Sequence, residues 1–187
     1  MSNLIFNESF NVVWPSDKVE ELNYFLLNDV PIIDYSKGSR SCCAKIPRPE
    51  WKHYDGLFPN DTPAIFLKLR SDDEINWCSL YHELGHIMLG HLDEERQGER
   101  TSEVDRGIVS KEELEADAYA CEMMGREKTI RWLNLLLDET KRKIDCLEYL
   151  EQERENGLCE QEKENLNIFR RSNQEVTLRI KAIENIS

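Results

Sequence analysis

The residues best suited to chemistry lie in the pentapeptide H-E-L-G-H, which runs from His82 to His86. Residues four apart in a helix lie on the same side, so both imidazoles can bind one cation, and zinc accepts such ligands in tetrahedral geometry. Glu83 lies about 100° around the helix from His82, given roughly 3.6 residues per turn. There it can act as a general base on a water molecule that zinc activates. The pattern predicts a catalytic zinc (Zn²⁺) site.

A catalytic zinc site takes three protein ligands and leaves one position open, so a third ligand must come from elsewhere in the chain. His91 is the nearest candidate. The metzincin pattern, however, requires glycine at position 89 and histidine at position 92, where this sequence has Leu89 and Leu92. We therefore expect His91 to be a surface residue at the end of its helix, where a positive charge is favourable.

The gluzincin pattern instead takes a glutamate from a later helix, with an aspartate four residues on. The string E-x-x-A-D that begins at Glu113 has this spacing. Glu113 would be the third metal ligand, and Asp117 would accept a hydrogen bond from the outer nitrogen of a ligand histidine. Glu112 and Glu115 are alternative ligands, although neither has an aspartate four residues on. Glu113 also has an alternative role, because Ser110 and Glu113 have the spacing of a helix capping box.

Two helices are expected to position these residues. One begins after Ser71 and ends near Gly90, and the other runs over residues 111–125 with Ser110 as its N-cap. A further helix is expected over residues 17–28. The apolar stripes that should face the core are Trp77, Tyr81, Leu84 and Met88 in the first of these helices, and Leu114, Ala118 and Cys121 in the second.

The rest of the chain predicts a small sheet and a helical hairpin. Proline and glycine break residues 30–70 into short apolar runs typical of strands, of which 64–69 is the clearest. Residues 126–187 carry two long amphipathic stripes separated by an asparagine–glycine pair, which indicates two antiparallel helices joined by a tight turn. We expect an α+β fold with a metal-binding domain over residues 1–125 and a C-terminal hairpin over 126–187.

Charge and cysteine content limit the partners and the compartment. The net charge of −13 argues against binding to nucleic acid or to an anionic membrane surface. The N-terminal sequence lacks the pattern of a signal peptide, and no apolar run is long enough to span a membrane. The six cysteines are scattered and include no C-x-x-C pair. We therefore expect a cytoplasmic protein with reduced thiols.

The segments HELGHIMLGH and EELEADAYACEMM resemble the ImmA/IrrE family of metallopeptidases. The resemblance covers about residues 62–125 and implies a minimal zincin-like core, in which a small antiparallel sheet packs on the metal helices. It also implies a gluzincin-like site formed by His82, His86 and Glu113, with Glu83 catalytic. Tyr119 stands where the family usually has phenylalanine. The chain lacks the DNA-binding helix-turn-helix of many members and has the hairpin instead.

The resemblance further implies a protein substrate, commonly a transcriptional repressor encoded in a phage, mobile element or stress regulon. We expect a zinc endopeptidase in which the free edge of the strand at 64–69 pairs with an extended substrate segment. One further donor should stabilise the oxyanion beside the zinc. The candidates for that donor are His53, Tyr54, His91 and Arg106.

A different class of function is compatible with the same residues. The chain could be a zinc-containing regulatory protein that binds a partner, or a second copy of itself, through the hairpin at 126–187, with little or no proteolysis. The hairpin could equally serve only to cover the core.

Overall fold

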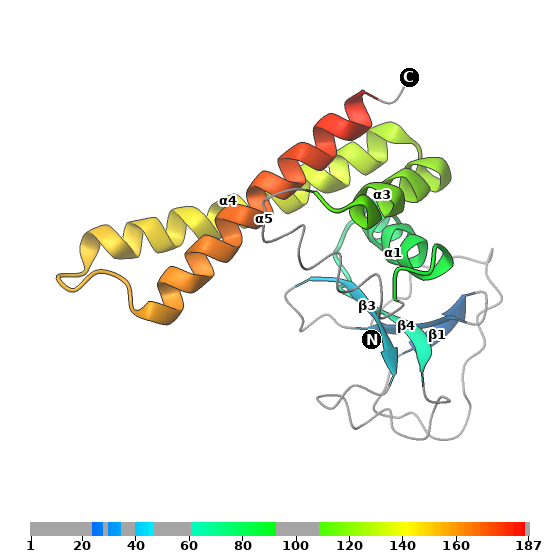
Figure 1. Ribbon diagram of the computed structural model, residues 1–187, viewed down its shortest axis with the longest axis horizontal. Coiled ribbons are helices and arrows are strands. Elements are labelled where there is room, and N and C mark those ends of the chain that lie inside the picture. The colour runs from blue at the N-terminus through cyan, green and yellow to red at the C-terminus, as the bar shows by residue number, and fades with distance from the viewer. Residues whose placement is uncertain (1–23, 28–29, 35–39, 47–60, 93–108, 186–187) are drawn as a thin grey trace. The chain divides into compact units, whose positions relative to one another are not determined.

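The computed structural model describes residues 24–27, 30–34, 40–46, 61–92 and 109–185 (Figure 1). The chain falls into two compact units, residues 1–97 and 98–187. The first unit contains the described strands and helix α1, and the second contains helices α3, α4 and α5. The fold class is α+β, as the sequence predicts. The domain boundary after residue 125 stays a prediction. None of the described helices combines the length and the apolar character needed to cross a bilayer.

Four strands form one mixed sheet in the first unit, in the order β1-β2-β4-β3. They are β1 (Tyr24–Leu27), β2 (Val30–Asp34), β3 (Cys42–Ile46) and β4 (Thr62–Leu67). β1 pairs with β2 and β3 pairs with β4 in antiparallel fashion, whereas β2 and β4 are parallel. The expectation of a purely antiparallel sheet is therefore wrong at the central pair.

Two other predictions for this unit are wrong. The helix expected over residues 17–28 is a strand at Tyr24–Leu27, and residues 17–23 lie outside the described part of the chain. A short apolar run fits a buried strand as well as a helix, and the pairing with β2 decides the outcome. The strand expected at 64–69 is β4 (Thr62–Leu67), and it has no free edge because it lies between β2 and β3.

The core of the first unit lies between the sheet and helix α1 (Asp73–Met88), which packs against β3 and β4 (Figure 1). Hydrogen bonds fix this packing: the Ser79 hydroxyl lies 2.8 Å from that of Ser41, which accepts at 3.0 Å from the backbone N–H of Lys68. The N-cap is Asp72 rather than Ser71, because the Asp72 carboxylate accepts from the second and third backbone N–H groups of the helix. The buried side chains of this core include Ile32, Ile33, Ile65, Phe66, Leu67, Leu80 and Leu84.

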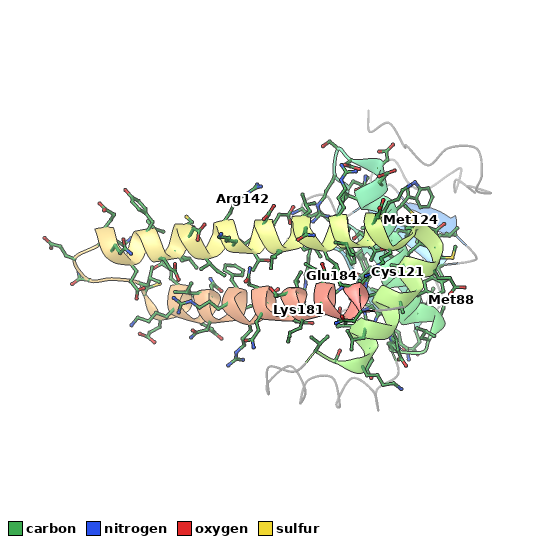
Figure 2. The ribbon with its side chains drawn as sticks, turned by 90° about the horizontal axis from the view of Figure 1, so that it is seen from above. Met88, Cys121, Met124, Arg142, Lys181 and Glu184 are labelled. Atoms are coloured by element: carbon green, nitrogen blue, oxygen red, sulfur yellow. The ribbon has the colours of Figure 1, made fainter. Side chains whose placement is uncertain are left out.

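Three helices form the second unit: α3 (Lys111–Met124), α4 (Arg126–Glu153) and α5 (Glu160–Glu184). The Ser110 hydroxyl accepts from the backbone N–H of Glu113 at 3.3 Å, which confirms Ser110 as the N-cap of α3. Figure 2 shows α4 and α5 side by side along their length, with Arg142 on the side of α4 away from α5. The predicted hairpin over 126–187 is therefore confirmed for the described residues.

The hairpin is closed at both ends. At the turn, Gly157 has a φ of 64°, a left-handed conformation that suits glycine. Beside it the Glu162 carboxylate accepts from the backbone N–H of Cys159 at 2.9 Å and from the Arg154 guanidinium at 2.8 and 2.9 Å. At the other end the Arg126 side chain donates to the backbone carbonyl of Glu184. These contacts hold α4 and α5 in a fixed pairing.

Candidate metal centre

His82 and His86 lie together on the buried side of α1, as the four-residue spacing predicts. Their side chains are 4% and 2% exposed. Their Nε2 atoms lie 3.2 Å apart, and the ring planes meet at 90°. Two imidazole nitrogens therefore face the same point. Glu83, the predicted general base, is buried on the same helix at 8% exposure.

The buried face of α1 differs from the expected apolar stripe. Met88 was expected in the core and is 58% exposed. The helix instead buries a face that contains several polar side chains, because it carries the histidine pair inward. The buried residues of α1 are Ile75, Asn76, Cys78, Ser79, Leu80, His82, Glu83, Leu84, Gly85 and His86.

His91 is buried against His86, so the expectation that it is a surface residue is wrong. It is 1% exposed, and its Nδ1 atom lies 2.9 Å from Nδ1 of His86. The cause is the way in which α1 ends. Gly90 has a φ of 72°, and its N–H donates to the carbonyl of Ile87, while the N–H of His91 donates to the carbonyl of His86.

This pattern is a Schellman motif, which turns the chain back and brings the second residue after the cap against the last turn of the helix. The cap residue is Leu89, so that second residue is His91 and the residue it meets is His86. Gly90 and His91, four and five residues after His86, carry the signal for this contact. On sequence grounds His91 is weighed as a metal ligand, as a charge at the helix end and as an oxyanion donor, and none of these roles predicts a contact with His86.

In the second unit, α3 buries its acidic residues. Glu113 is 5% and Asp117 is 1% exposed, and Ala116 between them is fully buried. Leu114, which was expected in the core, is 36% exposed, and Ala118 is also exposed. The stripe predicted for this helix is therefore wrong, because the helix turns its E-x-x-A-D face inward.

The buried carboxylates of α3 share one arginine from α5. Arg179 donates to Asp117 through Nε at 2.7 Å and through Nη2 at 2.6 Å, and its Nη1 lies 3.0 Å from Oε2 of Glu113. Burial acts to lower the pKa of the guanidinium, but the charges of Asp117 and Glu113 outweigh it and hold the pKa above its ordinary value. The predicted hydrogen bond from a ligand histidine to Asp117 stays a prediction.

Arg179 was not found from the sequence. The sequence does contain a clue that Arg179 is buried. It falls among the apolar residues Val176, Ile180 and Ile183, which form the buried side of α5. An arginine in such a stripe needs buried carboxylates as partners. The two acidic residues of the E-x-x-A-D string were the available candidates.

The two alternative ligands on α3 have different surroundings. Glu115 is partly exposed and forms a surface ion pair with Lys111 at 3.2 Å, so its carboxylate points away from the buried face. Glu112 is 6% exposed, and its Oε2 atom has no hydrogen-bond partner among the described residues. Glu112 therefore remains a competitor that an experiment must separate from Glu113.

Within the described part of the chain, one set of three side chains could hold a metal ion: His82, His86 and Glu113, all of them buried. Of the candidates for an oxyanion donor, His91 is placed as above. The other three, His53, Tyr54 and Arg106, lie outside the described residues.

Comparisons with protein-family models, with curated proteins and with solved structures find no match for this chain. The resemblance to ImmA/IrrE peptidases therefore rests on the two motifs alone.

Proposed function

We propose that this chain is a zinc-dependent endopeptidase in which His82, His86 and Glu113 bind the metal and Glu83 is the general base. The observation that carries the proposal is the 3.2 Å separation of the two histidine Nε2 atoms. Two nitrogens at about 2.0–2.1 Å from one tetrahedral zinc ion lie about 3.3–3.4 Å apart. The histidine pair therefore already has the spacing that a shared zinc ion requires.

One of the two tautomer pairs that this geometry allows suits metal binding. When Nδ1 of His86 donates its proton to Nδ1 of His91, Nε2 of His86 carries a free lone pair. A hydrogen bond of this kind also fixes the orientation of the ring. His91 thus supports a zinc site on His86 without itself binding the metal.

The charges around Glu113 favour a cation. With Glu113 and Asp117 ionised, these two carboxylates and Arg179 together carry a formal charge of −1. A cation bound at Glu113 would offset that negative charge. Two neutral imidazoles and one carboxylate form the ligand set of many catalytic zinc sites, with a fourth position left for water or substrate.

Glu83 would carry the proton in the reaction. Zinc, when bound, acts as a Lewis acid on the scissile carbonyl and on the attacking water. Glu83 accepts a proton from that water and later delivers it to the leaving amine. Glu83 follows His82 on α1 and is 8% exposed, so its side chain is largely shielded from bulk solvent.

The sheet supports a revised account of substrate binding within a zincin-like core. α1 packs against β3 and β4, and β3 is at one end of the order formed by the described strands. We propose that an extended substrate segment pairs with the outer side of β3, because β4 is already paired on both sides. The proposed substrate is a protein regulator, such as a transcriptional repressor, on the strength of the motif resemblance.

The second candidate function is a zinc-containing regulatory protein that acts through its hairpin with little or no proteolysis. The observation in its favour is the exposure of apolar side chains on α4 and α5, where Tyr149 is 61% and Ile168 is 51% exposed. Such residues can contact a partner, although single exposed apolar residues are common on protein surfaces. The same experiment separates the two functions.

That experiment compares wild type with Glu83→Gln in cells that naturally produce the protein, using proteome-wide identification of new N-termini. Glutamine keeps the size of the side chain but cannot act as a base. We expect a small set of N-termini that depends on wild type and is absent in Glu83→Gln, with zinc bound by both proteins. An unchanged biological effect in Glu83→Gln, without any such N-termini, would establish the binding function instead.

A further inference from the structure

One guanidinium in the second unit contacts both acidic residues of the E-x-x-A-D face. Arg179 binds Asp117 through two hydrogen bonds, and its Nη1 atom lies 3.0 Å from Oε2 of Glu113. Glu113 and Asp117 are four residues apart on α3, so a single side chain from α5 can span them. The arginine thus pairs with both carboxylates at once.

The surroundings of Arg179 hold it in place. Its side chain is 8% exposed, and its Cζ atom lies 5.7 Å from the centre of the Trp132 ring on α4. A guanidinium over an indole ring gains a favourable cation–π contact. The bidentate pairing with Asp117 fixes the plane of the guanidinium, because both partners are planar. Nη1 is therefore held in a fixed position beside Glu113.

This arrangement has a consequence for metal binding that rests on the zinc site proposed above. A glutamate can bind a metal through one or both of its oxygens. We infer that Arg179 is a positioning residue that holds Oε2 of Glu113 and so restricts this ligand to metal binding through Oε1. The restriction keeps the coordination number at three protein atoms and leaves the fourth position open for chemistry.

The inference also gives the hairpin a role in the site. Arg179 lies on α5, and α5 is held against α4 by the contacts at both ends of the hairpin. The hairpin therefore contributes Arg179, the residue that orients the Glu113 carboxylate. Its loss would affect the ligand directly, in addition to any loss of packing.

The test uses cobalt(II), which replaces zinc in such sites and absorbs visible light more strongly with four ligands than with five. The purified full chain would be reconstituted with cobalt as wild type, Arg179→Met and Arg170→Met. Arg170 is the matched control, because it is an exposed arginine of α5 that pairs with Glu148 at 2.7 Å. We expect equal spectra for wild type and Arg170→Met.

For Arg179→Met we expect a weaker, five-coordinate spectrum and a loss of metal affinity of roughly 10–100-fold, as is usual when a group that orients a ligand is removed. Arg179→Lys, which restores a positive charge, should recover part of the wild-type spectrum. An Arg179→Met protein with the wild-type spectrum and affinity would overturn the inference and leave the metal site standing. A wild-type chain that binds no cobalt would instead overturn the proposed site.

Loss of Arg179 leaves Asp117 buried without its partner, so the variant could fail to fold. In that case a structure of the wild-type protein tests the inference without any variant. A crystal structure of the zinc-loaded chain should show one oxygen of Glu113 on the metal and the other on Arg179. Both oxygens of Glu113 on the metal would contradict the inference.

Discussion

The Nδ1 atoms of His86 and His91 lie 2.9 Å apart, inside the first unit and shielded from solvent. Two ring nitrogens at this distance share one proton, so one ring donates and the other accepts. The contact orients the imidazole of His86 through its Nδ1 atom, while the Nε2 atom of His86 faces His82. We therefore expect His91 to influence metal binding through His86.

We predict that His91→Leu lowers zinc affinity by roughly 10–100-fold, because it removes the hydrogen bond that orients a ligand. His91→Asn should lose less, since the asparagine side chain can offer an oxygen in place of Nδ1. A competition titration against a coloured zinc chelator measures both. Tyr149→Ala is the control, as Tyr149 lies on α4 and is 61% exposed. Wild-type affinity in His91→Leu would show that the contact has no influence on the metal.

Metal binding should stabilise the folded chain. A ligand that binds only the native state adds about 2.7 kcal/mol to the free energy of unfolding at a hundredfold excess over its Kd. We therefore expect the thermal midpoint to fall when zinc is removed by a chelator and to recover when zinc is added back. Glu113→Ala and His86→Ala should show little response to either treatment. A midpoint in wild type that is indifferent to the chelator would contradict the prediction.

The stability of the hairpin should depend on Leu133, a buried leucine of α4. Leu133 is 0% exposed, whereas Leu178 on α5 is 37% exposed. Leu133→Ala should lower the free energy of unfolding by about 2–5 kcal/mol through lost burial and an internal cavity. Leu178→Ala, the same change at the surface, should cost well under about 1 kcal/mol. Urea unfolding followed by circular dichroism compares them, and equal losses would show that the packing described for α4 is wrong.

The turn of the hairpin should weaken in acid. The backbone N–H of Cys159 and the Arg154 guanidinium lower the pKa of the Glu162 carboxyl from its ordinary value of 4.5. A carboxyl with a lowered pKa in the folded state stabilises the fold above its unfolded pKa, and that contribution is lost as the pH falls through the folded pKa. We therefore predict that the stabilisation from the Glu162 carboxylate at the N-terminus of α5 is lost as the pH falls below 4.5.

Carbon-detected NMR of the Glu162 carboxyl measures this effect. We expect the Glu162 carboxyl to titrate at a lower pH in the folded chain than in the urea-unfolded chain. Arg154→Ala should reduce the difference between these two titration midpoints. The same midpoint in both states would refute the prediction.

Local patterns predicted the parts of this molecule in which local interactions decide the structure. The four-residue spacing put His82 and His86 on one side of a helix, and Ser110 capped α3 as expected. The hairpin followed from two long apolar stripes and a turn at Gly157. Each of these features depends on residues close together in the sequence.

The features that were predicted wrongly depend on contacts with other elements of the fold. The run at Tyr24–Leu27 is a strand because it pairs with β2, and β4 is central because two other strands flank it. On α3 the acidic face is buried, not the apolar one, since Arg179 contacts it from 62 residues further along the chain. Amphipathic patterns assume an apolar interior and fail where a helix buries functional groups.

The central claim is that Glu113 completes a metal site with His82 and His86, and metal content tests it most directly. Elemental mass spectrometry of the purified chain should find close to one zinc ion per molecule in wild type. Glu113→Ala should lose that zinc, while Glu112→Ala and Glu115→Ala retain it. A wild-type chain that remains free of metal after zinc is supplied, or a loss caused by Glu112→Ala in place of Glu113→Ala, would contradict the account.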